Sequence, residues 1–100
     1  MLERWLRAQR SGDPWRVRCI YAPNGSVAFR HAGTRRFAAE HEVADLVQRL
    51  VSRQVRTTGP VTGPGEFAAV RYADARSRGV VVLRTVDRRI IDQWVIVDVR

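Results

Sequence analysis

The last predicted strand carries two carboxylates that are candidates for acid–base chemistry. Together with Trp94 and Ile96, these two residues, Asp92 and Asp98, occupy every second position of the strand. The four side chains therefore share one face of it. On a face that lines a pocket, burial would raise the pKa of either carboxyl group and suit it to act as a general base. On an outer face, the same groups would pair with arginines such as Arg84 or with a partner copy. We favour the outer face, because aspartate in a strand is usually solvated.

The other candidates for chemistry are a histidine and a cysteine. His31 ends the first predicted strand, where an imidazole could transfer protons near neutral pH. The sequence identifies no partner for His31, and a hydrogen-bonded surface histidine is the commoner case. Cys19 is the single cysteine, which excludes an internal disulfide and a cysteine-based zinc site. We therefore expect Cys19 to be a small apolar residue on a helix, and we expect neither a metal nor a cofactor.

The positive charge of the chain comes entirely from arginine. All 18 cationic residues among the 100 are Arg, and the formal net charge is +8. Arginine binds phosphate well, but no block of like charges, no nucleic-acid-binding motif and no phosphate-loop motif occurs. We therefore attribute most of this charge to the solvent-exposed surface of the domain, and we do not expect nucleic acid as the partner.

The elements that must position these residues are predicted by hydrophobic periodicity. The length predicts one domain over residues 1–100, and helical spacing in the first half followed by alternation from Glu66 onward predicts the α+β class. No apolar run reaches the roughly 20 residues of a membrane span, and no secretory signal is visible, so we expect a cytoplasmic protein. The three tryptophans are expected in the core. Expected helices cover residues 2–9, 14–21 and 41–54, and expected strands cover 26–31, 67–72, 79–86 and 90–99. Residues 32–39 are expected as a loop with some extended character, and residues 57–65 as a loop or hairpin tip.

Four segments of the chain follow one another in an order typical of a known superfamily. They are the helix with Trp5 that leads to Ser11-Gly12-Asp13, the Tyr21–Val27 segment, the helix over residues 41–54, and the closing Val86–Trp94 hairpin. In these segments the chain resembles the nuclear-transport-factor-two-like superfamily, which includes SnoaL-like cyclases and ketosteroid isomerases. The chain is shorter than most of these proteins, and Arg88 stands where their closing hairpin usually has glycine.

The resemblance implies a conical α+β barrel, in which N-terminal helices and one long helix pack on a strongly curved, mostly antiparallel sheet. It also implies a deep apolar pocket and a homodimer. In the alignment that the resemblance implies, the positions of the base and the two proton donors of a ketosteroid isomerase correspond to Phe29, Trp5 and Val81. The position of the acid of a SnoaL-like protein corresponds to Val95. None of these side chains suits acid–base catalysis. The residues expected to line the pocket are Trp5, Tyr21, Phe29, Tyr72, Val81, Trp94 and Val95.

Three functions therefore stay open at this stage. The first is a binding protein for a small apolar molecule that lacks the standard acid–base set. The second is an isomerase, cyclase or hydrolase-like enzyme that acts on a steroid- or polyketide-like substrate and uses the relocated groups Asp98, Asp92 and His31. The third is a module whose work is dimerisation or another protein interaction.

Overall fold

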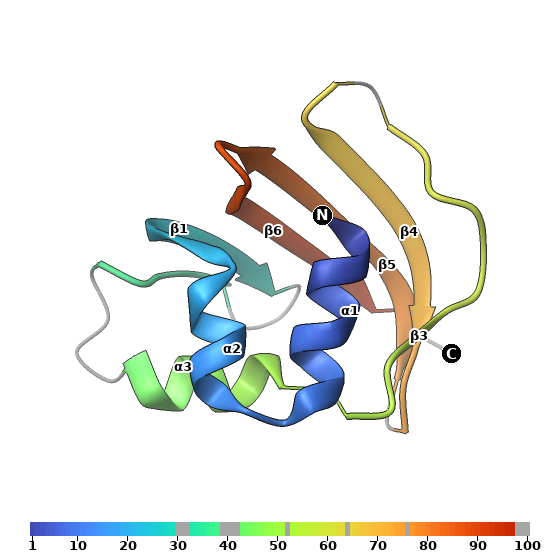
Figure 1. Ribbon diagram of the computed structural model, residues 1–100. Coiled ribbons are helices and arrows are strands. Elements are labelled where there is room, and N and C mark those ends of the chain that lie inside the picture. The colour runs from blue at the N-terminus through green and yellow to red at the C-terminus, as the bar shows by residue number, and fades with distance from the viewer. Residues whose placement is uncertain (30–32, 39–42, 52, 64, 76, 98–100) are drawn as a thin grey trace.

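In the part of the chain that the structure describes, three helices pack on one side of a curved sheet (Figure 1). The computed structural model describes residues 1–29, 33–38, 43–51, 53–63, 65–75 and 77–97. The described residues form the helices α1 (Leu2–Ser11), α2 (Pro14–Cys19) and α3 (Val43–Leu50), and the strands β1 (Tyr21–Phe29), β2 (Gly33–Arg36), β3 (Arg56–Thr57), β4 (Phe67–Ala73), β5 (Arg78–Val86) and β6 (Arg89–Val97). The expected α+β class is confirmed.

The two N-terminal helices begin and end where the local sequence predicts. Gly12 ends α1 in the left-handed conformation, with φ 68°, which glycine adopts without steric cost. The Asp13 side chain then caps α2 by accepting a hydrogen bond from the backbone N–H of Trp15 at 3.0 Å, and Pro14 occupies the first helical position. The short connection brings α1 and α2 side by side on the sheet.

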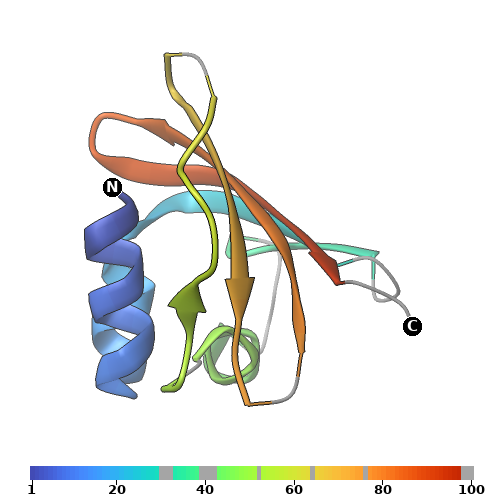
Figure 2. The same cartoon turned by 90° about the vertical axis from the view of Figure 1, so that its right-hand side faces the viewer.

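The sheet is mixed and open, with the strand order β2-β1-β6-β5-β4-β3. The β1 and β6 strands pair in parallel, and every other described pair is antiparallel. Figure 2 shows the sheet bending over α3, which is seen end-on. The concave side of this bend faces the helices, so side chains that point inward from the middle strands lie between the sheet and the helices.

The core lies between the helices and this concave face. Val17, Val27, Leu83 and Ile90 are fully buried, and α3 contributes Leu46, Val47 and Leu50 at helical spacing. The expected inward residues of the second helix, Val17, Ile20 and Tyr21, are all buried. Helical and strand periodicity thus identified the buried faces correctly.

Two tryptophans and Cys19 are more exposed than we expected. Trp15 is 73% exposed and Cys19 is also exposed, because they lie one turn apart on the outer side of α2 while Val17 and Ile20 face inward. Trp94 is 36% exposed on the far side of the sheet. The expectation of three core tryptophans is therefore wrong, because Trp5 is the one tryptophan in the core. Cys19 lies on a helix as expected, but it is exposed and does not pack as an apolar residue.

Several element boundaries also differ from the prediction. The first strand begins at Tyr21 instead of residue 26, because Tyr21 pairs with Ile90 and a register shift before Ser26 absorbs the turn-like Pro23-Asn24-Gly25 sequence. The extended character expected within residues 32–39 takes the form of a short strand, β2, over Gly33–Arg36. The third helix ends at Leu50 instead of residue 54, whereas residues 41 and 42, with which the predicted helix begins, lie outside the described residues.

The β5–β6 hairpin is a site of local backbone strain. Asp87 and Arg88 have φ of 50° and 64°, a left-handed conformation that glycine adopts far more easily than arginine. Replacing Arg88 by glycine should therefore raise the free energy of unfolding by about 0.5–1 kcal/mol, measured by urea denaturation. The hydrogen bond that Arg4 donates to the backbone carbonyl oxygen of residue 88 would persist, because the acceptor is a main-chain atom and does not depend on the side chain.

The matched control for this prediction is Arg89→Gly. Arg89 begins the β6 strand, where a glycine weakens the strand, so this neighbouring change should lower stability. Equal effects of the two substitutions would contradict the assignment of strain to Arg88.

Candidate functional site

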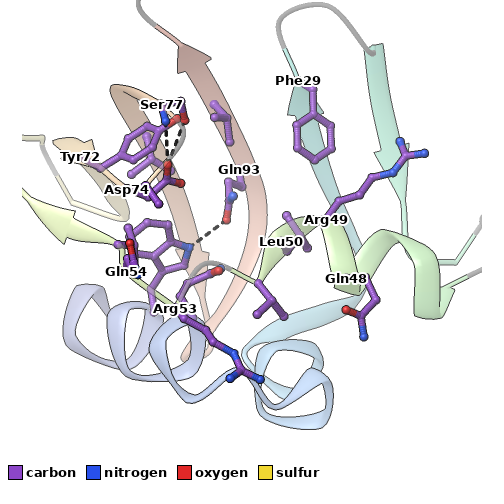
Figure 3. Close-up of a pocket in the computed structure, with 17 residues that line it drawn as sticks. Phe29, Gln48, Arg49, Leu50, Arg53, Gln54, Tyr72, Asp74, Ser77 and Gln93 are labelled. Atoms are coloured by element: carbon purple, nitrogen blue, oxygen red, sulfur yellow. Dashed lines mark hydrogen bonds between the residues drawn. The ribbon is translucent and has the colours of Figure 1, made fainter.

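The curved sheet and the helices enclose a cavity of about 610 Å³. Figure 3 shows Gln93 of β6 between Tyr72 of β4 and Phe29 of β1, with Leu50 of α3 below them. Antiparallel pairing of β5 and β6 sets Val81 opposite Val95, and both line the cavity beside Gln93. The apolar part of the lining consists of Phe29, Leu50, Val51, Val55, Ala75, Val81 and Val95.

The side-chain amide of Gln93 is the polar centre of this wall. Gln93 is 3% exposed, and its Oε1 accepts hydrogen bonds from Trp5 Nε1 at 3.3 Å and from the Tyr21 hydroxyl at 2.5 Å. An indole N–H can only donate, so the bond to Trp5 fixes Oε1 as the atom on that side of the amide. The Nε2 group, with its two N–H donors, therefore lies on the other side.

Tyr21 supports Gln93 from beneath the cavity lining. Tyr21 is 1% exposed, and this burial raises the pKa of its hydroxyl well above the ordinary value. The group therefore stays neutral and keeps donating to Gln93 across the physiological pH range. Tyr21 acts as a fixed support for the amide instead of an ionisable group.

A second buried amide lies on α1. Gln9 is 1% exposed and lines the cavity one helical turn after Trp5. Its Oε1 atom has no hydrogen-bond partner among the residues that the structure describes. The atom itself has almost no surface that water can reach, so it does not open onto the cavity.

Three charged side chains, those of Arg49, Arg53 and Asp74, are among the residues that line the cavity. Asp74 follows β4, and its Oδ1 accepts hydrogen bonds from the backbone N–H of Ser77 at 2.8 Å and from the Ser77 hydroxyl at 3.4 Å. Asp74 N–H in turn donates to Ser77 O, so the pair closes the β4–β5 turn. In Figure 3 the guanidinium groups of Arg49 and Arg53 point away from Gln93, and Arg49 pairs with Asp45 at 3.3 Å.

The structure brings together five of the seven residues expected at a pocket. Trp5, Phe29, Tyr72, Val81 and Val95 line the cavity. Tyr21 is not among the lining residues and instead reaches the site through Gln93. Trp94 lies on the opposite face of β6, where its ring stacks on Phe67 with centroids 6.4 Å apart. The placement of Trp94 in the pocket is therefore wrong, because consecutive strand residues point to opposite faces.

Asp92 also lies on the outer face of β6. Its carboxylate accepts hydrogen bonds from Ser26 Oγ at 2.6 Å and from Arg84 Nη1 at 3.2 Å. Arg84 also bonds to Glu66 at 3.1 Å. The carboxylate of Glu66 makes the larger contribution and that of Asp92 the smaller one to raising the pKa of the Arg84 guanidinium. Asp92 thus belongs to a surface ion-pair network, and it does not bring acid–base chemistry to the cavity.

The remaining candidates for catalysis fall outside the described part of the chain. His31 and Asp98 are both among the residues whose structure is not described. Within the described part, no group of three or more metal-ligating side chains comes together. Asp74 is the single carboxylate that the described residues contribute to the cavity lining.

Solved structures share this arrangement of a curved sheet over helices. A scan against protein-family models finds no match, and a search of curated proteins also finds none. A SnoaL-like protein from Burkholderia thailandensis superposes over 97% of this chain and 91% of its own, with TM-score 0.76 and 14% identity. An NTF-2 like protein from Burkholderia xenovorans matches 96% of this chain and 78% of its own, with TM-score 0.71 and 11% identity. The chain has the nuclear-transport-factor-two-like fold.

A third solved structure with this fold is that of a protein named as an enzyme. An LEH-like epoxide hydrolase from M. tuberculosis covers 97% of this chain and 79% of its own, with TM-score 0.70 and 17% identity.

The two Burkholderia structures confirm the expected nuclear-transport-factor-two-like cone, here in a compact form whose sheet is open. No described helix is long and apolar enough to cross a membrane.

Sequence reasoning missed the residues that give this cavity its polar character. Gln93 shares a strand face with Val95, so strand alternation alone would have placed it in the pocket once Val95 was placed there. Gln9 follows Trp5 at helical spacing on the same stripe, which was also a usable signal. Asp74 and Ser77 reach the cavity from a turn, where no periodicity indicates direction.

Proposed function

We propose that the cavity binds a small, neutral and mainly apolar molecule. The observation that carries this proposal is the amide of Gln93, held by two buried donors beside Val81 and Val95 in the cavity wall. Ligand sites in proteins are typically clefts of about 300–1,000 Å³ with apolar linings and a few fixed polar groups. A cavity of about 610 Å³ lies within that range. A neutral amide orients an apolar ligand without demanding a charge on it.

Binding is better supported than catalysis by the side chains in this cavity. The positions that the family resemblance assigns to acid–base groups carry Phe29, Trp5, Val81 and Val95, all of which line the cavity. The Oδ1 atom of Asp74 is engaged by Ser77 within a turn.

Blocking the cavity provides the test of this proposal. Val95 lines the cavity, whereas its neighbour Ile96 is 48% exposed on the other face of the strand. Val95→Phe should abolish the thermal stabilisation given by neutral steroid- and polyketide-sized compounds, and Ile96→Phe should leave it unchanged. For the unmodified chain, a compound at a hundred times its Kd should raise stability by about 2.7 kcal/mol. Failure of every compound to raise the melting temperature would refute a ligand-binding role.

Homodimerisation stays a prediction, and the outer face of the sheet supports it. Phe67, Trp94 and Ile96 are large apolar residues that are at least partly exposed there. Such apolar surface is typical of faces that bind another protein. A cytoplasmic location likewise remains a prediction.

A further inference from the structure

A second hollow is lined by residues of the two N-terminal helices, α1 and α2, which lie side by side in Figure 1. This α1–α2 groove has a volume of about 270 Å³ and shares no lining residue with the larger cavity. Two buried side chains line it, those of Ala8 on α1 and Ile20 at the end of α2, together with the mostly exposed ring of Trp15. A tryptophan beside an apolar hollow is the kind of anchor that protein interfaces use.

Three arginines also line the α1–α2 groove, and no acidic residue does. Arg4 and Arg7 lie at neighbouring positions on one face of α1, and Arg16 lies on α2. Within the described ranges, no carboxylate forms an ion pair with Arg4 or Arg7. Arg16 pairs with Asp13 only at 3.8 Å, and both side chains are exposed to water. The groove therefore carries positive charge that a negatively charged partner would neutralise.

Arg4 is held in position at this groove by the backbone. Its Nη1 donates to the carbonyl oxygen of Arg88 at 2.6 Å, which orients the guanidinium. A guanidinium has five N–H donors, so most of those of Arg4 remain available after this bond. Such a planar set of donors matches the two oxygens of a carboxylate. Less side-chain freedom is lost when a carboxylate binds an arginine that is already oriented.

The shape of the groove favours an acidic peptide over other negatively charged partners. Trp15 is the one aromatic residue that the described part of the chain contributes to the groove, whereas single-stranded nucleic acid typically stacks on successive aromatic rings. A membrane surface would contact Trp15 but would not reach the buried Ala8 and Ile20 in the hollow. A peptide satisfies both parts, because one apolar side chain enters the hollow while neighbouring carboxylates meet the arginines.

We propose that the α1–α2 groove is a docking site for an acidic segment of another protein. One large apolar side chain of that segment packs against Trp15, and carboxylates on either side of it pair with Arg4, Arg7 and Arg16. Tryptophan and arginine are both enriched in protein interfaces. The docking site is separate from the cavity under the sheet, so it does not depend on whether that cavity binds a ligand.

Selection from a library of random dodecapeptides on the immobilised full chain tests this proposal without assuming a sequence. We expect the enriched peptides to share aspartate or glutamate on both sides of a leucine, phenylalanine or tryptophan. Their binding should weaken as the salt concentration is raised, because salt screens exposed charge pairs. Enrichment of basic or uncharged peptides, or of no peptide, would overturn the proposal.

Two substitutions test whether the most enriched peptide binds in the groove. Arg7→Glu should weaken its binding by about tenfold or more, because a repulsion replaces an attraction. Trp15→Ala should weaken it by about the same factor through loss of the anchor contact. Both side chains are exposed, so the melting temperature of each variant should stay close to that of the unmodified chain.

Arg78→Glu is the matched control for the charge. Arg78 is exposed on β5 and does not line the groove, and its substitution changes the net charge by the same amount as Arg7→Glu. The control should therefore retain nearly all of the binding. Equal losses in the two variants would show that the peptide is attracted by net charge alone and would overturn the proposed site.

The single cysteine provides a direct readout of occupancy. Cys19 lines the groove and is exposed, so a saturating amount of the peptide should remove most of its reactivity toward a thiol-reactive dye. Unchanged reactivity would overturn the placement of the peptide. Vesicles of phosphatidylserine and phosphatidylcholine test the other negatively charged surface. If the chain binds these vesicles through Trp15 and binds no peptide, the groove is a membrane contact and the proposal fails.

Discussion

Replacing Gln93 by methionine should lower the free energy of unfolding by about 2–4 kcal/mol. The substitution keeps the volume of the side chain but removes the acceptor for Trp5 Nε1–H and the Tyr21 hydroxyl, both of which are buried. Each buried donor without an acceptor costs about 1–3 kcal/mol. For a domain of this size the melting temperature should fall by roughly 10–20 °C, which calorimetry or urea denaturation at pH 7 would measure.

A double substitution separates the loss of hydrogen bonds from a simple packing defect. Adding Tyr21→Phe to Gln93→Met removes one of the two stranded donors, so the second substitution should cost much less than it does in the unmodified chain. The expected coupling is about 1–2 kcal/mol, within the range seen for residues in one network. Additive effects, or a loss below about 1 kcal/mol for Gln93→Met alone, would contradict the central position of Gln93.

The fold was predictable from the sequence because its elements have strong local signals. Leu46, Val47 and Leu50 mark a helix by spacing, and Asp13-Pro14 marks the start of another. The strand that begins at Tyr21 was not predictable in this way. Its first residues pair with Ile90, and that contact overrides the local turn preference of Pro23-Asn24-Gly25. Long-range pairing of this kind leaves no trace in local propensity.

The site was predictable only in its apolar part. Phe29 and Val81 were located because the resemblance assigns their positions to a pocket, and both line the cavity. The hydrogen bond between Trp5 and Gln93 joins residues 88 positions apart, so the sequence does not show it. Trp94 was misplaced for a simpler reason, since it and Val95 cannot both face the cavity from one regular strand.

The arginine-only composition has a consequence for stability at high pH. Lysine side chains ordinarily lose their charge near pH 10.4, but this chain has none, and arginine keeps its charge beyond pH 12. The outer ion pairs of Arg84 with Glu66 and Asp92 therefore persist into alkaline solution. A loss of stability between pH 10 and 12 is then free of the lysine contribution that complicates this range in most proteins.

Stability should consequently fall above pH 10 with a slope set by Tyr21. Burial raises the pKa of its hydroxyl in the folded chain, whereas the unfolded chain titrates near the ordinary value of about 10. The folded state then holds a proton that the unfolded state has released, so this contribution to stability is complete below pH 10 and decreases as the pH rises further. One such group gives a decrease of about 1.4 kcal/mol per pH unit. Urea denaturation at half-unit intervals from pH 8 to 12 would measure it.

Tyr21→Phe provides the decisive comparison. The variant lacks the ionisable hydroxyl, so its stability should lie about 1 kcal/mol lower at pH 8, where it has lost the bond to Gln93. Its stability should then change much less with pH, and the two curves should converge or cross between pH 10 and 12. Tyr72, the other tyrosine in the chain, gives the matched control Tyr72→Phe, which should keep the slope due to Tyr21. An unchanged slope in Tyr21→Phe would show that Tyr21 is not the neutral donor that fixes Gln93, and the amide would then be free to present either of its ends to a ligand.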